Sequence, residues 1–336
     1  MEPVKLKRSY KDYIWGGERL KTDYGKTTDM TPLAESWELS VHSDGEARTS
    51  DGIPLSLALT KERMGTNAAR HALFPVLTKF IDAKADLSVQ VHPSDEYALK
   101  NEGSLGKTEM WYIIDAQPDA YIYAGFKEEL SSEQYEQKVA DGTIMEALAK
   151  HSVHTGDVFY IPAGRVHAIG KGVLLAEVQQ SSDVTYRIYD YDRMGLDGKP
   201  RELHTHLAAQ ALDFKVYPEY RNSYKDVIDT ANACLDTEHF TVRVVSIKEP
   251  IHRNMIKYDS FIIHTCTKGQ CKIRIRSTHD EITLQEGYSS LIPAAIADYD
   301  IIPINGEVKV LESYINNSTQ STFRRMISQF LHMSNI

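Results

Sequence analysis

The chain has 336 residues, which is long enough for two or three compact domains. Its 47 acidic and 38 basic side chains give a formal net charge of −9, which excludes a non-specific nucleic-acid-binding protein because no basic excess is present. Three cysteines without a CxxC pattern, an N-terminus without an apolar signal segment, and the lack of long apolar runs predict a cytoplasmic protein without a membrane span.

The first hundred residues alternate between strand-like and helix-like segments. Short alternating pieces broken by Gly, Asp and Pro predict strands and turns over 1–50, and helical spacing predicts a helix over 56–72 that Gly65 and Asn67 interrupt. Two strands are predicted at 76–83 and 87–92. In the second strand, three polar side chains alternate with apolar ones and so share one face, which in a β-barrel can be the interior: Ser88, Gln90 and His92.

The middle of the chain predicts further strands around one longer helix. A hairpin is predicted from strands at 111–115 and 120–126. Ser131 or Ser132 then caps a helix over 133–150, with an interruption expected at Asp141-Gly142. Strand patterns return in four short segments: 157–162, 167–169, 173–179 and 185–189.

The last third predicts a helix at 204–212, a polar linker at 217–238 and then a run of strands. The strands are expected at 241–247, 260–265, 271–276, 281–284, 289–292 and 308–313. Many short strands separated by turns favour a sandwich or barrel over a parallel α/β sheet.

The two halves of the chain contain similar segments. GDVFYIPAGRVHAI in the first half resembles GYSSLIPAAIADYDI in the second. Aligning Pro162 with Pro293 places His167 opposite Asp298. We therefore expect two related barrels, of which only the first has kept its metal ligand.

The most specific motif is the spacing of Gly156, Pro162, Gly164 and His167, which is that of the second cupin motif with Lys171 at its last position. Pro162 and Gly164 are suited to a tight turn between two strands. His167 then follows with its imidazole directed into the barrel, and neutral imidazole is the commonest protein ligand of a divalent transition metal.

Three further residues complete a candidate metal site. Gln90 and His92 lie two residues apart and so share a strand face, and Glu109 opens the next strand. Taken singly, such residues are more often satisfied or solvated side chains than ligands. Together with His167 they offer two imidazoles, a carboxylate and an amide, which suits Zn²⁺ with a position left open for substrate.

Four segments resemble the short bacterial class I (type I) mannose-6-phosphate isomerases: SVQVHP (88–93), GKTEMWYII (106–114), GDVFYIPAGRVHAI (156–169) and EVQQSSDVTYRIYDYDR (177–193). The resemblance is good from residue 1 to about 215 and only general beyond it. It implies a mainly β fold of two cupin (jelly-roll) barrels with a small helical insertion. The implied parts are an N-terminal catalytic barrel (1–127 and 153–203), helical segments (128–152 and 204–235) and a degenerate C-terminal barrel (236–336).

The resemblance also implies the interconversion of mannose 6-phosphate and fructose 6-phosphate, with one Zn²⁺ per chain. The implied zinc ligands are His92, Glu109 and His167, with Gln90 in the place of an amide ligand. A proton moves between C1 and C2 of the opened sugar through a cis-enediolate, whose charge a Lewis-acidic zinc ion stabilises.

By the same resemblance, Lys107, Glu177 and Arg187 occupy catalytic positions, and Ser88 occupies a position associated with the substrate phosphate. Lys84 is a further candidate for the phosphate. The sequence leaves open which of the three catalytic candidates carries the proton.

Three other functions remain open at this point. One is a non-catalytic metal-binding cupin that binds a sugar phosphate, although it gives Glu177 and Arg187 no role. Another is an iron-dependent oxygenase, although Gln90 stands where such sites usually have a third histidine. A cupin-type glucose-6-phosphate isomerase is the nearest alternative. The expected partner is a small sugar phosphate, with no nucleic acid or membrane, and we expect a monomer or weak homodimer.

Overall fold

The computed structural model describes residues 2–71, 74–195 and 198–316. Its secondary structure is mainly strand with few and short helices, which confirms the predicted fold class. The chain divides into an N-terminal unit (Tyr10–Trp37 and Leu77–Asn222) and a C-terminal unit (Met1–Ser9, Glu38–Val76 and Ser223–Ile336). This division differs from the expected one near the start of the chain, because β1 (Val4–Lys7) pairs with β20 (Ser289–Ile292).

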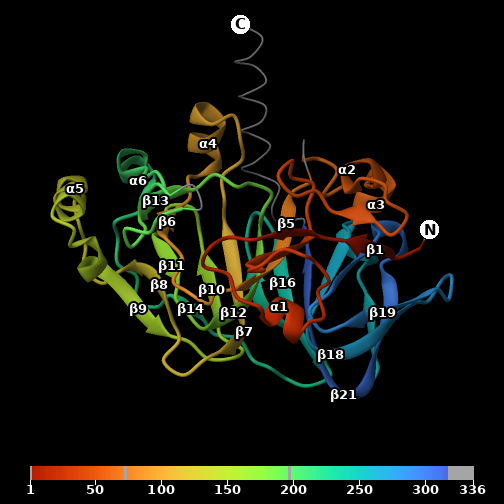
Figure 1. Cartoon of the computed structure of the whole chain (residues 1–336). Coiled ribbons are helices and arrows are strands. Elements are labelled where there is room, and N and C mark those ends of the chain that lie inside the picture. Colours follow the sequence, from red (N-terminus) through yellow and green to blue (C-terminus); the bar gives the residue numbers. More distant parts are fainter. Residues whose placement is uncertain (1, 72–73, 196–197, 317–336) are drawn as a thin grey trace, which may run out of the picture. The chain divides into compact units, whose positions relative to one another are not determined.

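The N-terminal unit contains two sheets (Figure 1). The seven-stranded sheet has the order β14 (Arg221–Asn222), β10 (Val158–Ile161), β7 (Glu109–Ala116), β12 (Val173–Gln180), β5 (Val76–Asp82), β3 (Glu35–Leu39) and β2 (Ser9–Lys11). The five-stranded sheet has the order β13 (Tyr186–Tyr189), β6 (Val89–Val91), β11 (His167–Ile169), β8 (Tyr121–Phe126) and β9 (Leu148–Ser152).

One apolar core joins these two sheets. It contains Trp111 and Phe159 from the seven-stranded sheet and Ile122 and Ile169 from the five-stranded sheet, all at most 2% exposed. Apolar side chains from both sheets thus fill a shared interior, as expected of a barrel or sandwich.

A second core packs helices onto the five-stranded sheet. Tyr135, Ile144 and Ala208 lie in one cluster with side chains of β6, β11 and β13. The helices of this unit are α1 (Arg19–Thr22), α4 (Asp95–Asn101), α5 (Ser132–Ala140), η1 (Ile144–Ala147) and α6 (Thr205–Ala211). Ser131 caps α5 as predicted, but the helix does not continue to 150, because residues from Leu148 onward pair with β8 as β9.

The C-terminal unit is built on a nine-stranded sheet. Its main path is β15 (Thr230–Asp236), β16 (Thr241–Ile247), β21 (Asp298–Tyr314), β18 (Ile262–Ile275), β20, β1 and β4 (Arg48–Thr49), while β17 (Ile251–Asn254) pairs with β21 and β19 (Glu281–Gln285) pairs with β18. The predicted linker at 217–238 is therefore wrong, since it contains β14 and β15.

The helices of the C-terminal unit are short: α2 (Leu55–Ala58), α3 (Lys61–Met64), η2 (Ile256–Tyr258) and η3 (Ala294–Ile296). The helix predicted over 56–72 is confirmed only in part: the segment forms α2 and α3, α3 ends at the predicted interruption Gly65, and residue 72 lies outside the described residues. Thr60 has an extended backbone and caps α3, and Gly65 ends it with φ of +78°, so the segment forms two separate turns of helix.

The similar segments of the two halves form corresponding elements. Strands β10 and β20 start at positions 158 and 289, and β11 and β21 start at His167 and Asp298. All are offset by the same number of residues, as the alignment of Pro162 with Pro293 requires. Asp298 here pairs with the imidazole of His252 at 2.6 Å.

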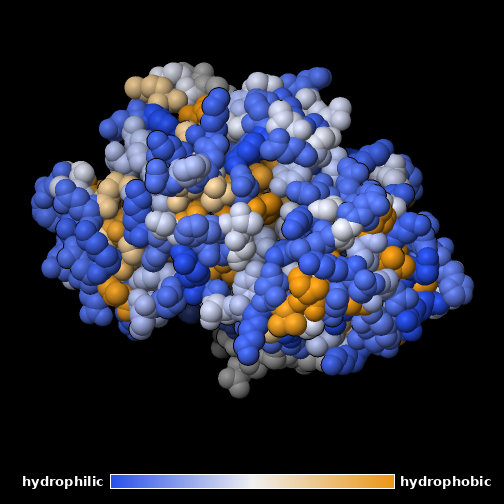
Figure 2. Space-filling model, turned by 90° about the horizontal axis from the view of Figure 1, so that it is seen from below, coloured by the Kyte–Doolittle hydropathy of each residue, from blue (hydrophilic) through white to orange (hydrophobic). Residues whose placement is uncertain are grey.

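Hydrophilic residues dominate the face shown in Figure 2, where hydrophobic residues form separate groups among them. Leu57, at 74% exposure, is the most exposed of the large hydrophobic residues that the structure describes. Such scattered apolar surface is ordinary for a globular protein. Within the described residues, no helix combines the length and apolar character needed to cross a membrane.

Candidate metal centre

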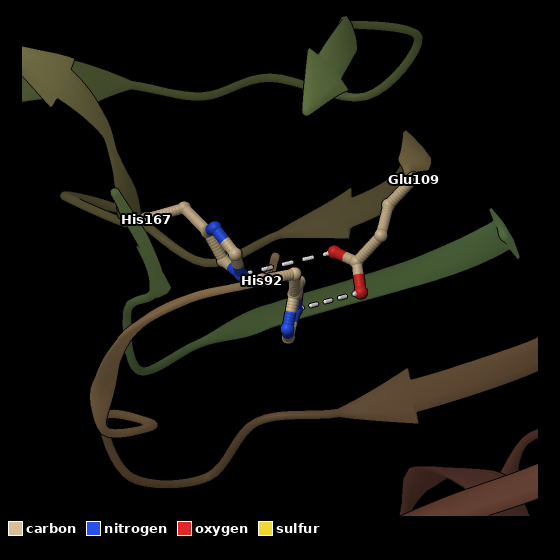
Figure 3. A group of neighbouring side chains, drawn as sticks. All are labelled: His92, Glu109 and His167. Carbon is tan, nitrogen blue, oxygen red and sulfur yellow. Dashed lines mark ion pairs between the residues drawn. The ribbon is translucent and has the colours of Figure 1, made fainter. Parts of the chain in front are cut away.

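Three strands of the N-terminal unit bring the predicted metal ligands together (Figure 3). His92 follows the last residue of β6, Glu109 is the first residue of β7, and His167 is the first residue of β11. Strands β6 and β11 are paired, with His167 opposite Gln90. Residues separated by up to 75 positions in the sequence thus meet because of strand pairing.

The three side chains form a tight and buried cluster. His92 Nε2 lies 3.1 Å from Glu109 Oε1, and His167 Nε2 lies 3.8 Å from Glu109 Oε2. The two imidazole rings are 4.7 Å apart between centroids. All three residues are at most 1% exposed, so water cannot easily satisfy their polar atoms.

Hydrogen bonds fix the tautomer of both imidazoles. His92 Nδ1 lies 2.8 Å from the carbonyl oxygen of Val184, and His167 Nδ1 lies 2.8 Å from that of Arg165. A carbonyl can only accept, so each Nδ1 carries the proton and each Nε2 presents a lone pair. Both Nε2 atoms are buried, and neither has a hydrogen-bond partner among the described residues.

The electrostatics keep these imidazoles neutral. Burial, followed by the positive charge of Lys107, lowers the pKa of His92 to about 3. Burial also lowers the pKa of His167. Two neutral imidazole nitrogens therefore face an ionised carboxylate, and a divalent cation suits this set of donors.

Lys107 lies next to the cluster. Its Nζ is 2.9 Å from Glu109 Oε1, and the side chain is buried. Burial by itself would raise the pKa of Glu109, but the positive charge of Lys107 is the largest of the influences that hold that pKa well below its usual range. Glu109 is therefore a carboxylate.

Gln90 and Arg187 occupy neighbouring positions on β6 and β13. Arg187 lies opposite Gln90 in the strand register, and His167 lies opposite Gln90 on the other side. Arg187 donates from Nη1 to the carbonyl oxygen of Glu202 at 2.8 Å. Its Nε is buried and has no hydrogen-bond partner in the described part of the chain. This N–H group is therefore available to donate to an anionic oxygen.

Glu177 lies on β12 beside the cluster. The indole Nε1 of Trp111 donates to Glu177 Oε2 at 2.9 Å and to Glu109 Oε2 at 3.1 Å. Lys79 Nζ lies 3.2 Å from Glu177 Oε1. Burial and the negative charge of Glu109 raise the pKa of Glu177 to about 7, although Lys79 and Lys107 oppose the shift.

The two predicted phosphate contacts differ in their surroundings. Ser88 is buried immediately before β6, on the strand face that Gln90 and His92 share. Lys84 is exposed beyond the end of β5, and no hydrogen bond or ion pair of the described residues joins its ammonium to the cluster. The structure thus groups Ser88, but not Lys84, with the other site residues.

Two buried charges near Glu177 were not predicted as site residues. Lys79 on β5 lies between Glu177 and Glu35, and the indole of Trp37 donates to Glu35 at 2.7 Å. The signal in the sequence is a lysine in the middle of an apolar strand for Lys79, whereas Glu35 begins its strand and gives no such signal. A buried charge needs a partner, but the sequence alone does not identify which one.

Comparisons with known proteins identify relatives of this chain. The family described as phosphomannose isomerase type I, catalytic domain, matches residues 4–135. The mannose-6-phosphate isomerase of Streptococcus mutans serotype c is 33% identical over 323 residues, which cover 94% of this chain and 99% of that protein.

Solved structures share the fold. The crystal structure of the mannose 6-phosphate isomerase from Bacillus subtilis superposes with a TM-score of 0.85 at 32% identity, covering 94% of this chain and all of that one. A mannose 6-phosphate isomerase that was solved with zinc and yttrium bound has a TM-score of 0.74 at 17% identity over 94% of this chain and all of that one. The extent of the similarity to the streptococcal and Bacillus enzymes shows that the chain belongs to the type I mannose-6-phosphate isomerase family of enzymes.

Proposed function

We propose that the protein is a zinc-dependent aldose–ketose isomerase that interconverts D-mannose 6-phosphate and D-fructose 6-phosphate. The observation that carries the proposal is the buried pair of imidazole lone pairs facing Glu109, which a bound divalent cation would satisfy. The substrate is inferred from the names of the streptococcal and Bacillus relatives.

In this proposal His92, Glu109 and His167 hold one Zn²⁺ per chain, and Gln90 is a candidate fourth ligand on the same strand face as His92. Two imidazoles and a carboxylate are a common zinc donor set that leaves a position for substrate. The zinc present in a solved protein of the same fold supports this choice of metal. When bound, the ion would supply a Lewis acid that stabilises negative charge on the C1 and C2 oxygens of the opened sugar.

Glu177 is the proposed acid/base. It would take the proton from one carbon of the C1–C2 pair and return it to the other. A pKa of about 7 suits both halves of this task, because the group can gain and lose a proton near neutral pH. Lys107 lies against Glu109 and would keep that carboxylate ionised and in place.

Arg187 and Ser88 are the proposed anion contacts. The unpaired Nε of Arg187 can donate to a developing oxyanion or to the phosphate, and Ser88 offers a hydroxyl on the strand that leads to His92. Lys84, which is exposed, would reach the phosphate only from outside this group.

A coupled isomerase assay with several sugar phosphates tests the proposal. We expect turnover of mannose 6-phosphate, loss of turnover after chelation, and recovery on adding Zn²⁺. Conversion of glucose 6-phosphate in preference to mannose 6-phosphate would favour the neighbouring cupin isomerase. A zinc-replete protein without any turnover would favour the non-catalytic sugar-phosphate-binding cupin, and iron in the purified protein would favour the oxygenase.

Three further properties remain predictions. We expect the protein to act in the cytoplasm, without nucleic-acid or membrane partners. We also expect a monomer or a weak homodimer. Sedimentation velocity across a range of protein concentrations measures the oligomeric state directly.

A further inference from the structure

A row of buried charges crosses the seven-stranded sheet of the N-terminal unit. In the order β7-β12-β5-β3, four neighbouring strands each contribute one charged residue to this row. All of them are at most 7% exposed, and they are Glu109, Glu177, Lys79 and Glu35. One ammonium thus lies between the proposed acid/base and a second carboxylate that the reaction does not use.

The Lys79 ammonium lies near the carboxylates of both Glu177 and Glu35. Its Nζ lies 3.2 Å from Glu177 Oε1 and 3.5 Å from both oxygens of Glu35. Glu35 is itself held in place, because the indole Nε1 of Trp37 donates to its Oε2 at 2.7 Å. The negative charges of Glu177 and Glu35 raise the pKa of Lys79 although its burial opposes this, so Lys79 is an ammonium.

The consequence for Glu177 follows from the charges that face it. Lys79 and Lys107 favour its ionised form, whereas Glu109 and Glu35 favour its protonated form. Charge interactions are strong in a buried site because water screens them little. Without Glu35, the Lys79 ammonium would pair with Glu177 alone, and Glu177 would become a weaker base.

We infer that Glu35 is a positioning residue of the isomerisation: it shares the Lys79 ammonium with Glu177 and so keeps the Glu177 carboxylate in place and able to accept a proton. The inference rests on the proposed function, in which Glu177 transfers the proton. Glu35 acts through Lys79 and does not itself touch the reacting carbons.

Glu35→Gln is the informative variant, since Gln still accepts the Trp37 hydrogen bond but carries no charge. We expect kcat to fall about 10–100-fold, as is typical when a residue that orients a reactive group is changed. The acidic limb of the pH profile of kcat should move to lower pH, because Lys79 would then stabilise ionised Glu177 more fully. Zinc content and KM should stay unchanged.

Lys79→Gln should move the same limb in the opposite direction. Removing the cation leaves Glu177 facing the carboxylates of Glu109 and Glu35, so its protonated form is favoured and the limb moves to higher pH. A general structural defect would not shift the profile in opposite directions for two contacting residues.

Glu38→Gln is the matched control. Glu38 lies on the same strand, is 1% exposed and forms an ion pair with Arg8 at 3.3 Å, three residues from Glu35 and therefore on the other strand face. We expect this variant to change neither kcat nor the pH profile.

The outcomes separate the two proposals. Wild-type kcat and an unmoved limb in Glu35→Gln, or equal losses in Glu35→Gln and Glu38→Gln, would overturn the role of Glu35. Should Glu35→Gln fail to fold, Lys79→Gln decides, and an unmoved limb in that variant overturns the role. A wild-type protein that isomerises no sugar phosphate would instead overturn the proposed function.

Discussion

At the scale of single residues, the candidate metal centre depends on which ring nitrogens of His92 and His167 carry protons. The backbone carbonyls of Val184 and Arg165 accept hydrogen bonds from the Nδ1–H groups of His92 and His167, respectively. The two Nε2 lone pairs then face Glu109, which is ionised and can only accept. The two Nε2 atoms are buried without a donor among the described residues, which is costly, and a bound cation would remove that cost.

Removal of one of these ligands should abolish metal binding. For His167→Ala we expect the bound zinc, measured by mass spectrometry of the purified protein, to fall from one ion per chain to nearly none, with loss of isomerase activity. His151→Ala is the control, because His151 is bonded only to the carbonyl of Ala124 on the same sheet. Full zinc content in His167→Ala would contradict the assigned ligand set.

Loss of the proposed proton carrier should affect chemistry without affecting the metal. In Glu177→Gln the amide oxygen can still accept from Trp111, but the side chain cannot exchange a proton. We expect kcat to fall about 10²–10⁴-fold, the usual contribution of a positioned acid/base, with zinc content unchanged. A kcat close to that of the wild type would indicate that Lys107, and not Glu177, transfers the proton.

The sequence predicts single residues well only where a motif fixes their spacing. His167 follows from the cupin motif, His92 from the strand face that it shares with Gln90, and Glu109 from its place at the start of the next strand. Glu35 and Lys79 were not assigned, because their proximity to Glu177 depends on the strand order β12-β5-β3. No local pattern encodes a strand order, so a buried charge in a strand indicates a partner without naming it.

At the scale of elements, the turn between β10 and β11 connects the two histidines. Gly164 has φ of +89°, and its N–H donates to the carbonyl oxygen of His92 at 2.8 Å. The turn that leads to His167 is thereby tied to the residue that provides the other imidazole. This explains physically why the motif has glycine at this position.

Gly164→Ala should therefore weaken both stability and metal binding. We expect a loss of about 1–2 kcal/mol in the free energy of unfolding from the positive φ. An added Cβ would also meet the carbonyl oxygen of Ala211 at 3.2 Å, so the turn must shift, and zinc affinity should fall about tenfold. Urea unfolding and competition with a chelator measure the two effects.

The control for this prediction is Gly142→Ala. Gly142 has φ of +70° in the turn after α5, and a Cβ there would meet nothing within 4 Å. We expect a similar loss of stability with unchanged zinc affinity. A zinc affinity that falls equally in both variants would show that the Gly164 turn does not position the ligands.

Some strands were predicted with their observed limits, whereas segments whose structure depends on distant partners were not. The strands predicted at 167–169, 241–247 and 289–292 have the predicted limits. The segments 260–265 and 271–276 instead form one strand, β18, with register shifts between Cys266 and Gln270. Gly269 with φ of +76° permits this irregularity, and the same Gly looks like a turn in the sequence alone.

At the scale of the whole molecule, the two units have different buried polar groups. The N-terminal unit contains the candidate metal centre, whereas the C-terminal unit contains a buried ion pair between Arg253 and Glu312. Arg253 lies 2.5 and 3.1 Å from the two Glu312 oxygens, and the hydroxyl of Tyr299 donates to Glu312 at 2.9 Å. These partners satisfy the carboxylate inside the protein.

This cluster should make the protein sensitive to acid. Burial opposes ionisation of Glu312, but the neighbouring imidazole of His264 and the guanidinium of Arg253 outweigh it and lower its pKa from 4.5 to about 2. A depressed pKa contributes stability above pH 4.5 that is lost as the pH falls toward 2, and a shift of this size corresponds to about 3 kcal/mol. We expect Glu312→Gln to reduce the free energy of unfolding at pH 7, and the difference from the wild type to shrink on acidification.

Urea unfolding of both proteins from pH 7 to pH 3 measures this difference. Glu281→Gln in the same unit is the control, because Glu281 pairs with Arg274 and Lys272 at the surface, and such pairs contribute little. It should unfold like the wild type at every pH. If the wild type and Glu312→Gln instead lose stability in parallel on acidification, the buried carboxylate is not the group whose protonation destabilises the C-terminal unit.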